Sequence, residues 1–124
     1  MKKVIATNNA PAAIGPYSQA NQAGNLIITS GQLPIDPATG AFPEGIEAQS
    51  RQSLKNVQAI LKEAGVGMDA VIKTTVFLSD MNNFGAMNEV YKEFFASDFP
   101  ARSAVQVARL PKDALVEIEA IAVL

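Results

Sequence analysis

The chain closes on an apolar run, residues 115–124, that is interrupted by two carboxylates, Glu117 and Glu119. A run of this kind is typical of a strand that is buried on both faces. An acidic side chain inside such a strand costs free energy unless a cation or hydrogen-bond donors meet it. Arg102 is a charged side chain in a similar place, because it opens the apolar-rich run 103–107. Such residues usually have a structural partner or a chemical task, so these three are the leading candidates for a functional site.

Length and charge limit the classes of protein to consider. With 124 residues, 48% of them hydrophobic, the sequence predicts one globular domain over residues 1–124. A net charge of -2 and scattered lysines argue against nucleic-acid binding. Residues 1–11 carry two lysines without a following apolar stretch, which is not a secretory signal. No segment has the pattern of a membrane span, so we expect a soluble cytoplasmic protein with no membrane partner.

Cysteine and histidine are both absent from the sequence. Their absence excludes disulfides, thiol nucleophiles, imidazole bases and the usual zinc ligand sets. Any chemistry must therefore use carboxylate, hydroxyl, guanidinium, amide, amine or backbone groups. We expect no metal and no cofactor.

The pattern along the chain predicts strands that alternate with two helices. Apolar and β-branched residues indicate strands at 4–6, 17–22, 26–30, 71–78 and 115–124. Ala23-Gly24-Asn25 is a hairpin-like turn signal, and the segment 33–40, with two prolines, predicts a loop. Helical spacing runs from Ile46 to Ala64 and stops at Gly65.

A second helical stripe runs from Phe84 to Phe95, begins after a cap at Asp80 or Asn82, and ends before Pro100. This order predicts an α+β domain, an α/β sandwich in which both helices cover one face of a mixed sheet. The other face would still need cover, and self-association is the simplest source of it.

Three segments resemble the signatures of the Rid (reactive intermediate deaminase) family, also called YjgF. They are Ile14–Ala20, Ser30–Pro34, and Pro100–Val105 continued by Val116–Ile118. The resemblance spans nearly the whole chain and is closest to the RidA subgroup, the 2-iminobutanoate/2-iminopropanoate deaminases. It implies a chorismate-mutase-like fold and a homotrimer with three active sites in the clefts between subunits.

The resemblance also implies an activity. The family hydrolyses the enamine and imine products that pyridoxal-phosphate dehydratases release from threonine and serine, giving 2-oxo acids and ammonia. The implied partners are thus small 2-imino and 2-oxo carboxylic acids, with a functional link to those dehydratases. An already activated imine needs only carboxylate capture, a placed water and proton transfer, which this residue inventory can supply.

Carried over to this sequence, the resemblance gives each site residue a role. Arg102 would hold the substrate carboxylate, because a guanidinium presents two parallel donors to it. Glu117 would position or activate the attacking water. The remaining residues would line the cleft or orient water and the imine nitrogen (Tyr17, Ser30, Asn88), offer backbone N–H groups (Gly31, Ala104) or shape the wall (Pro111). Ala104 stands where many relatives have cysteine, so a thiol at this position is not needed.

Each of these residues also has a purely structural interpretation. Arg102 could form a salt bridge with Glu117 or Glu119, which share one strand face by the period of two. Asn88 lies on the apolar stripe of the second helix and could bond to backbone. Tyr17 could be a core-edge residue, and Ser30-Gly31 a strand end with a bulge.

Three other functions remain open at the level of sequence. The same Arg102 pocket would permit a non-catalytic trimer that binds 2-oxo acids as a regulatory module. Relatives have been described as endoribonucleases or translation inhibitors, although the low charge of this chain argues against RNA binding. A chaperone-like holdase is the third alternative.

Overall fold

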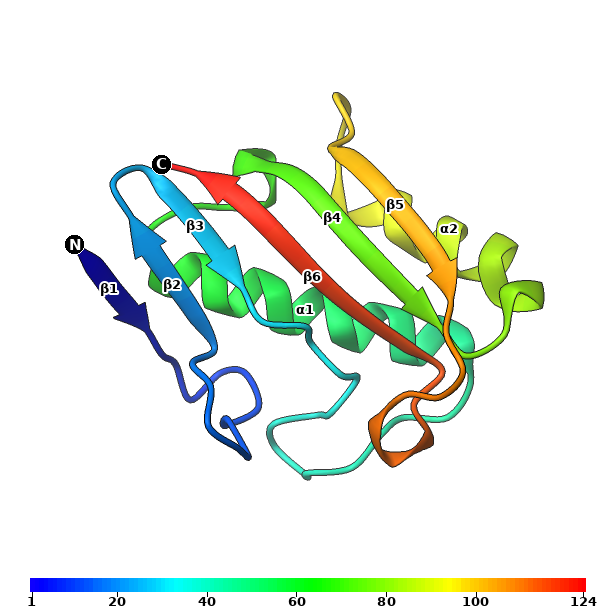
Figure 1. The fold of residues 1–124 in the computed structure, drawn as a ribbon. Coiled ribbons are helices and arrows are strands. Elements are labelled where there is room, and N and C mark those ends of the chain that lie inside the picture. The colour runs from blue at the N-terminus through cyan, green and yellow to red at the C-terminus, as the bar shows by residue number, and fades with distance from the viewer.

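The structure, a computed structural model, describes residues 1–124 and is built on one six-stranded sheet (Figure 1). The strands are β1 (Lys2–Ile5), β2 (Ala20–Ala23), β3 (Leu26–Thr29), β4 (Val71–Leu78), β5 (Ala101–Gln106) and β6 (Val116–Val123). Their order across the sheet is β1-β2-β3-β6-β4-β5. All neighbours are antiparallel except β4 and β5, which are joined through a helix. The closing strand β6 is therefore central, as its apolar run predicted.

Two α-helices, α1 (Ile46–Glu63) and α2 (Phe84–Tyr91), lie on the same face of the sheet (Figure 1). Short 3-10 turns precede β4, flank α2 and precede β6, at Met68–Ala70, Met81–Asn83, Lys92–Phe94 and Pro111–Asp113. The core lies between the helices and the sheet. Its fully buried side chains include Leu54 and Ile60 of α1, Met87 of α2, and Leu78 and Ile118 of the sheet. Burial of each such side chain contributes about 1.5–3 kcal/mol. The predicted fold class, α+β with both helices on one face, is confirmed.

The other face of the sheet is left open. Along β6, buried positions alternate with half-buried ones, and Glu117 and Glu119 both belong to the half-buried set. On the neighbouring strands, Ile28 of β3 is 49% exposed and Val105 of β5 is 43% exposed. β6 is thus buried on one face only within this chain, which corrects the prediction of a strand buried on both faces.

Several predicted boundaries shift in the structure. The strand predicted from Tyr17 begins only at Ala20, because the preceding Gln19 side chain is bonded to the loop carbonyls of Thr7 and Pro11. The hairpin turn is where the sequence placed it, with Gly24 at a φ of 58°. The apolar-rich run 103–107 belongs largely to β5, which begins at Ala101 and so includes Arg102.

The helix boundaries agree more closely with the sequence pattern. α1 is followed by Gly65, whose φ of 91° suits a helix end. The stripe predicted to reach Phe95 is an α-helix only to Tyr91 and continues as a 3-10 turn. Neither of the two predicted caps is the N-cap of α2, which is Asn83 and makes no side-chain cap bond. Asp80 instead caps the preceding 3-10 turn, since its side chain accepts a hydrogen bond from the backbone N–H of Asn82 at 2.9 Å. None of the helices combines the length and apolar content that crossing a membrane requires.

Candidate active site

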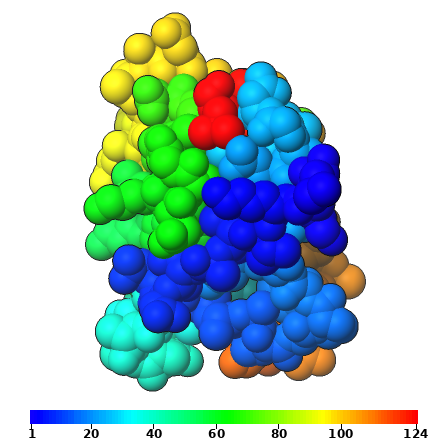
Figure 2. Space-filling model, turned by 90° about the vertical axis from the view of Figure 1, so that its left-hand side faces the viewer, coloured from blue at the N-terminus to red at the C-terminus, as the bar shows by residue number.

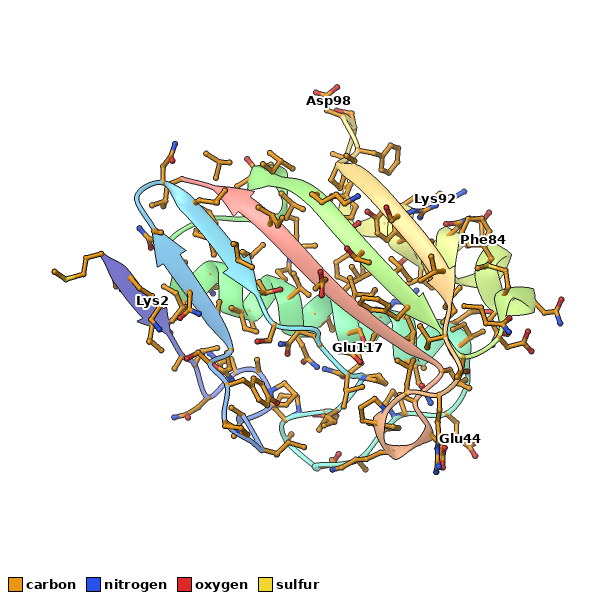
Figure 3. The ribbon with its side chains drawn as sticks, in the orientation of Figure 1. Lys2, Glu44, Phe84, Lys92, Asp98 and Glu117 are labelled. Carbon is orange, nitrogen blue, oxygen red and sulfur yellow. The ribbon has the colours of Figure 1, made fainter.

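Glu117 lies on the open face of β6, above the backbone of the chain segment that follows β3 (Figure 3). Gln32 and Ile118 exchange backbone hydrogen bonds of 2.7 and 3.2 Å, which extend the pairing between these segments. A Cβ built on Gly31 would overlap the Glu117 carboxylate, with Cδ only 2.9 Å away. Position 31 must therefore be glycine for the carboxylate to lie here.

The environment of this carboxylate disfavours its charged form. Burial raises the pKa of Glu117, and repulsion from Glu119 on the same strand face raises the pKa further. Neither glutamate takes part in any ion pair of the chain. A carboxyl group with a raised pKa is suited to exchanging protons with a substrate near neutral pH.

The Glu117 carboxylate opens into a pocket of about 340 Å³, which we call the carboxylate pocket. Its lining comprises Pro11, Ala12, Ile14, Tyr17, Gln19, Ser30, Gly31, Gln32, Leu33, Ile35, Pro111 and Glu117. The pocket thus brings together five of the predicted site residues, which are Tyr17, Ser30, Gly31, Pro111 and Glu117. The mixture of apolar walls with a few polar groups is characteristic of a small-molecule site.

Two hydroxyl groups of the carboxylate pocket have defined partners. The Ser30 hydroxyl donates to the carbonyl of Ser18 at 2.6 Å, so its oxygen remains free to accept. The Tyr17 hydroxyl accepts from the backbone N–H of Ile14 at 3.4 Å, and its own proton remains free to donate. Within one copy of the chain, 48% of the surface of Tyr17 is exposed. These two hydroxyl groups therefore offer one donor and one acceptor to the pocket.

Two buried amides that the sequence analysis did not single out shape the walls. Gln19 binds the carbonyls of Thr7 and Pro11 at 3.0 and 2.8 Å and accepts from the Thr7 N–H at 2.6 Å. Asn56 of α1 binds the carbonyls of Leu33 and Ile35 at 3.1 and 2.9 Å. The two loops that these amides hold lie against each other on one side of the molecule, where the blue N-terminal segment meets the cyan loop (Figure 2). An amide among the apolar positions of a predicted helix is the signal that could have found Asn56.

Arg102 lies on the helix-covered side of the sheet, at its β5 edge. It pairs with Thr74 of β4, which is buried against α2, and its Nη1 donates to Asn88 Oδ1 at 2.7 Å. The glutamates are on the opposite face, so the salt bridge offered as a structural alternative is not formed within the chain. The side chain of Asn88 bonds to Arg102, and no bond from it to the backbone is formed.

Arg102 borders a second pocket, of about 440 Å³, which we call the guanidinium pocket. Its lining comprises Asn88, Tyr91, Lys92, Phe99, Pro100 and Arg102. Figure 3 shows that the two regions are separate: Glu117 lies beside the segment that follows β3, whereas Phe84 of α2 and Lys92, which follows α2, lie beyond the β5 edge. Ala104 lines neither of these two pockets and contacts the hydrophobic core. No three acidic side chains gather anywhere into a metal site.

Comparison with known proteins gives consistent matches over the whole chain. The family model described as "Endoribonuclease L-PSP" matches residues 7–124. A 2-iminobutanoate/2-iminopropanoate deaminase of Salmonella typhimurium is 57% identical over 126 residues, covering 99% of this chain and 98% of the relative. The crystal structure of the YjgF gene product of E. coli is 57% identical and matches with a TM-score of 0.95, covering 98% of each chain. E. coli TdcF with bound serine is 52% identical, with a TM-score of 0.96 and the same coverage.

Proposed function

Since the chain belongs to the endoribonuclease L-PSP family, also called YjgF, we propose that it hydrolyses 2-imino acids to 2-oxo acids and ammonia. The family resemblance expected from the sequence is thereby confirmed. Curated relatives at 57% identity carry the name 2-iminobutanoate/2-iminopropanoate deaminase, which supports the same enzymatic activity here. The observation that carries the proposal is the half-buried Glu117 carboxylate, which has no cation partner and lies beside Tyr17 and Ser30 in one pocket.

The proposed reaction begins with water attacking C2 of the imine. As the oxygen–carbon bond forms, the C=N electron pair moves to nitrogen, and Glu117 accepts a proton from the water and passes it to nitrogen. The hydroxyl proton of the resulting carbinolamine is then transferred to the nitrogen as the C–N bond breaks, which releases ammonia and leaves the C=O group of the 2-oxo acid. The free Tyr17 proton and the Ser30 oxygen hold the water or the nitrogen in place. Positioned acid–base help of this kind contributes roughly 10²- to 10⁴-fold in rate.

Arg102 is the proposed anchor of the substrate carboxylate. It has no acidic partner in the chain, and Asn88 accepts from Nη1. The remaining guanidinium donors can form a bidentate pair with a carboxylate, which contributes on the order of 1.5–3 kcal/mol.

A complete site then requires two copies of the chain. Arg102 and Glu117 lie on opposite faces of one sheet, so no single small substrate reaches both within one copy. The open sheet face carries the exposed Ile28 and Val105 and needs cover. We therefore propose a homotrimer in which the guanidinium pocket of one copy faces the carboxylate pocket of the next. Ala104, near Arg102 on the edge strand, could offer backbone N–H groups to that cleft together with Gly31.

The substrates proposed for this site are unstable products of other enzymes. Pyridoxal-phosphate dehydratases acting on threonine and serine release 2-imino acids, and we place this protein after them, in the cytoplasm. The endoribonuclease activity named in the family description is not proposed here, because a net charge of -2 provides no cationic track for RNA.

The test couples a threonine dehydratase to this protein and follows the formation of 2-oxobutanoate. We expect faster release with wild type and no acceleration with Arg102→Ala or Glu117→Ala. Glu44→Ala is the matched control, since this exposed carboxylate lies far from Glu117 and borders neither pocket (Figure 3). A correctly assembled protein that binds 2-oxobutanoate without accelerating its formation would contradict the proposal and favour the non-catalytic binding module.

A further inference from the structure

We propose that Tyr91, together with Phe84, is a positioning residue that clamps the Arg102 guanidinium in the orientation needed to capture a carboxylate. This inference rests on the proposed function, because it concerns how the anchor of that site is held. From the sequence pattern, Tyr91 and Phe84 are expected only on the apolar stripe of the second helix.

The contacts around Arg102 come from one stripe of α2. The Cζ atom of Arg102 lies 4.8 Å from the Tyr91 ring centroid and 5.3 Å from the Phe84 ring centroid. Asn88, between them on the helix, accepts from Nη1 at 2.7 Å. Positions 84, 88 and 91 follow the helical spacing that places side chains on one face. The guanidinium is therefore held by two aromatic rings and one amide oxygen at once.

The Tyr91 ring is itself fixed from two sides. Its hydroxyl shares a 2.6 Å hydrogen bond with Thr74 Oγ1, on the strand that pairs with Arg102. Phe95 packs against the ring, with 4.9 Å between the centroids. Burial raises the pKa of Tyr91, so its hydroxyl stays protonated and can donate to Thr74. A ring anchored in this way can hold Arg102 without moving when a ligand binds.

Such a clamp matters because Arg102 has a long side chain on an edge strand and no acidic partner to order it. An unrestrained arginine loses rotamer freedom when it binds a carboxylate, which weakens binding. A cation held over aromatic faces has already lost that freedom, while its edge donors stay available. The clamp therefore predicts tighter ligand binding through preorganisation of the Arg102 guanidinium.

The experiment measures 2-oxobutanoate binding by calorimetry on the assembled protein. Tyr91→Leu replaces the ring by a smaller aliphatic side chain and should weaken binding about 3- to 30-fold. Tyr91→Phe keeps the ring but leaves Thr74 without its partner, so it should lower the melting temperature and change the dissociation constant less than about twofold. Phe94→Leu is the matched control, because this neighbouring ring packs against the core without contacting Arg102.

The clamp predicts that Tyr91→Leu weakens 2-oxobutanoate binding, whereas Tyr91→Phe mainly lowers the melting temperature. The clamp would be overturned if Tyr91→Leu bound 2-oxobutanoate as tightly as wild type does. It would also be overturned if Phe94→Leu weakened binding as much as Tyr91→Leu does. Absence of imine hydrolysis by wild type would contradict the proposed function and leave the binding comparison intact. If wild type binds no 2-oxobutanoate either, the NMR signals of the Arg102 side chain test the clamp alone. Ring-current shifts that disappear in Tyr91→Leu support it, and signals without such shifts in wild type overturn it.

Discussion

The Glu117 carboxylate occupies the space that a side chain at Gly31 would need. A Cβ at position 31 would overlap the carboxylate and lie 2.9 Å from Glu117 Cδ. Gly31 is held in place by the backbone hydrogen bonds between its neighbour Gln32 and Ile118, next to Glu117. This pairing fixes the backbone of Gly31, and the lack of a side chain at position 31 leaves the space that the carboxylate occupies.

Gly31→Ala should therefore displace the carboxylate and reduce kcat/KM by about 100-fold or more, because misplacement of a reacting group by about 1 Å is that costly. The measurement is steady-state imine hydrolysis. Gly85→Ala is the control, since a Cβ at this position of α2 meets no atom within 4 Å. It should leave activity unchanged and stabilise the helix by roughly 0.5–1 kcal/mol. Full activity in Gly31→Ala would mean that the position of Glu117 is not critical.

The raised pKa of Glu117 predicts how stability depends on pH. Because the folded protein binds this proton more tightly than the unfolded chain, the contribution of Glu117 is most favourable below the unfolded pKa. It decreases as pH rises through the higher folded pKa. Glu117→Gln removes this dependence and should gain stability relative to wild type at pH 7 but not at pH 4. Denaturant unfolding at both pH values measures the difference, and an equal effect at both would contradict the assignment.

Glu119 raises the pKa of Glu117 by charge repulsion. Glu119→Gln should remove the repulsion and shift the acidic limb of the pH–rate profile to lower pH, while kcat on the plateau stays within about threefold. A matched control is Glu47→Gln, an exposed carboxylate in the first turn of α1. If Glu119→Gln abolished activity on the plateau, Glu119 and not Glu117 would be the better candidate for the reacting carboxylate.

Arg102→Lys keeps the positive charge but loses the two parallel donors and the planar group that stacks on Tyr91 and Phe84. KM for the imine should rise about 10- to 100-fold, with a smaller change in kcat. Arg51→Lys provides the comparison, because Arg51 pairs with Glu93 on the exposed helix surface. Equal KM values for Arg102→Lys and wild type would show that charge alone captures the carboxylate.

Val105 tests the proposed assembly, because it is 43% exposed on the open face of β5. Val105→Asp should desolvate a charge at the interface between copies, dissociate the trimer and abolish activity. Gln58→Asp places the same charge on the exposed surface of α1 and should leave the trimer intact. Light scattering gives the mass of each variant. A wild-type monomer with full activity would contradict the shared site.

Sequence pattern predicted those features that depend on local spacing. The helix at 46–64 followed from its apolar spacing, and the shared face of Glu117 and Glu119 followed from the period of a strand. The strand start at Ala20 was not predictable, because the bonds that hold Gln19 come from a loop distant in sequence. For the same reason the spacing of Phe84, Asn88 and Tyr91 indicated a face of a helix but not that Arg102 lies against it. The partition of the candidate site into two pockets is a property of the tertiary fold alone.

Mixed trimers test the central claim most directly. Arg102→Ala and Glu117→Gln subunits are each expected to be inactive as homotrimers. If each site combines Arg102 of one copy with Glu117 of the next, equal mixing after dissociation and reassembly restores about one quarter of wild-type activity, because one site in four receives both intact groups. Restored imine hydrolysis near that level is the result that the account predicts. Mixed trimers, verified by mass, that remain as inactive as their parents would contradict it.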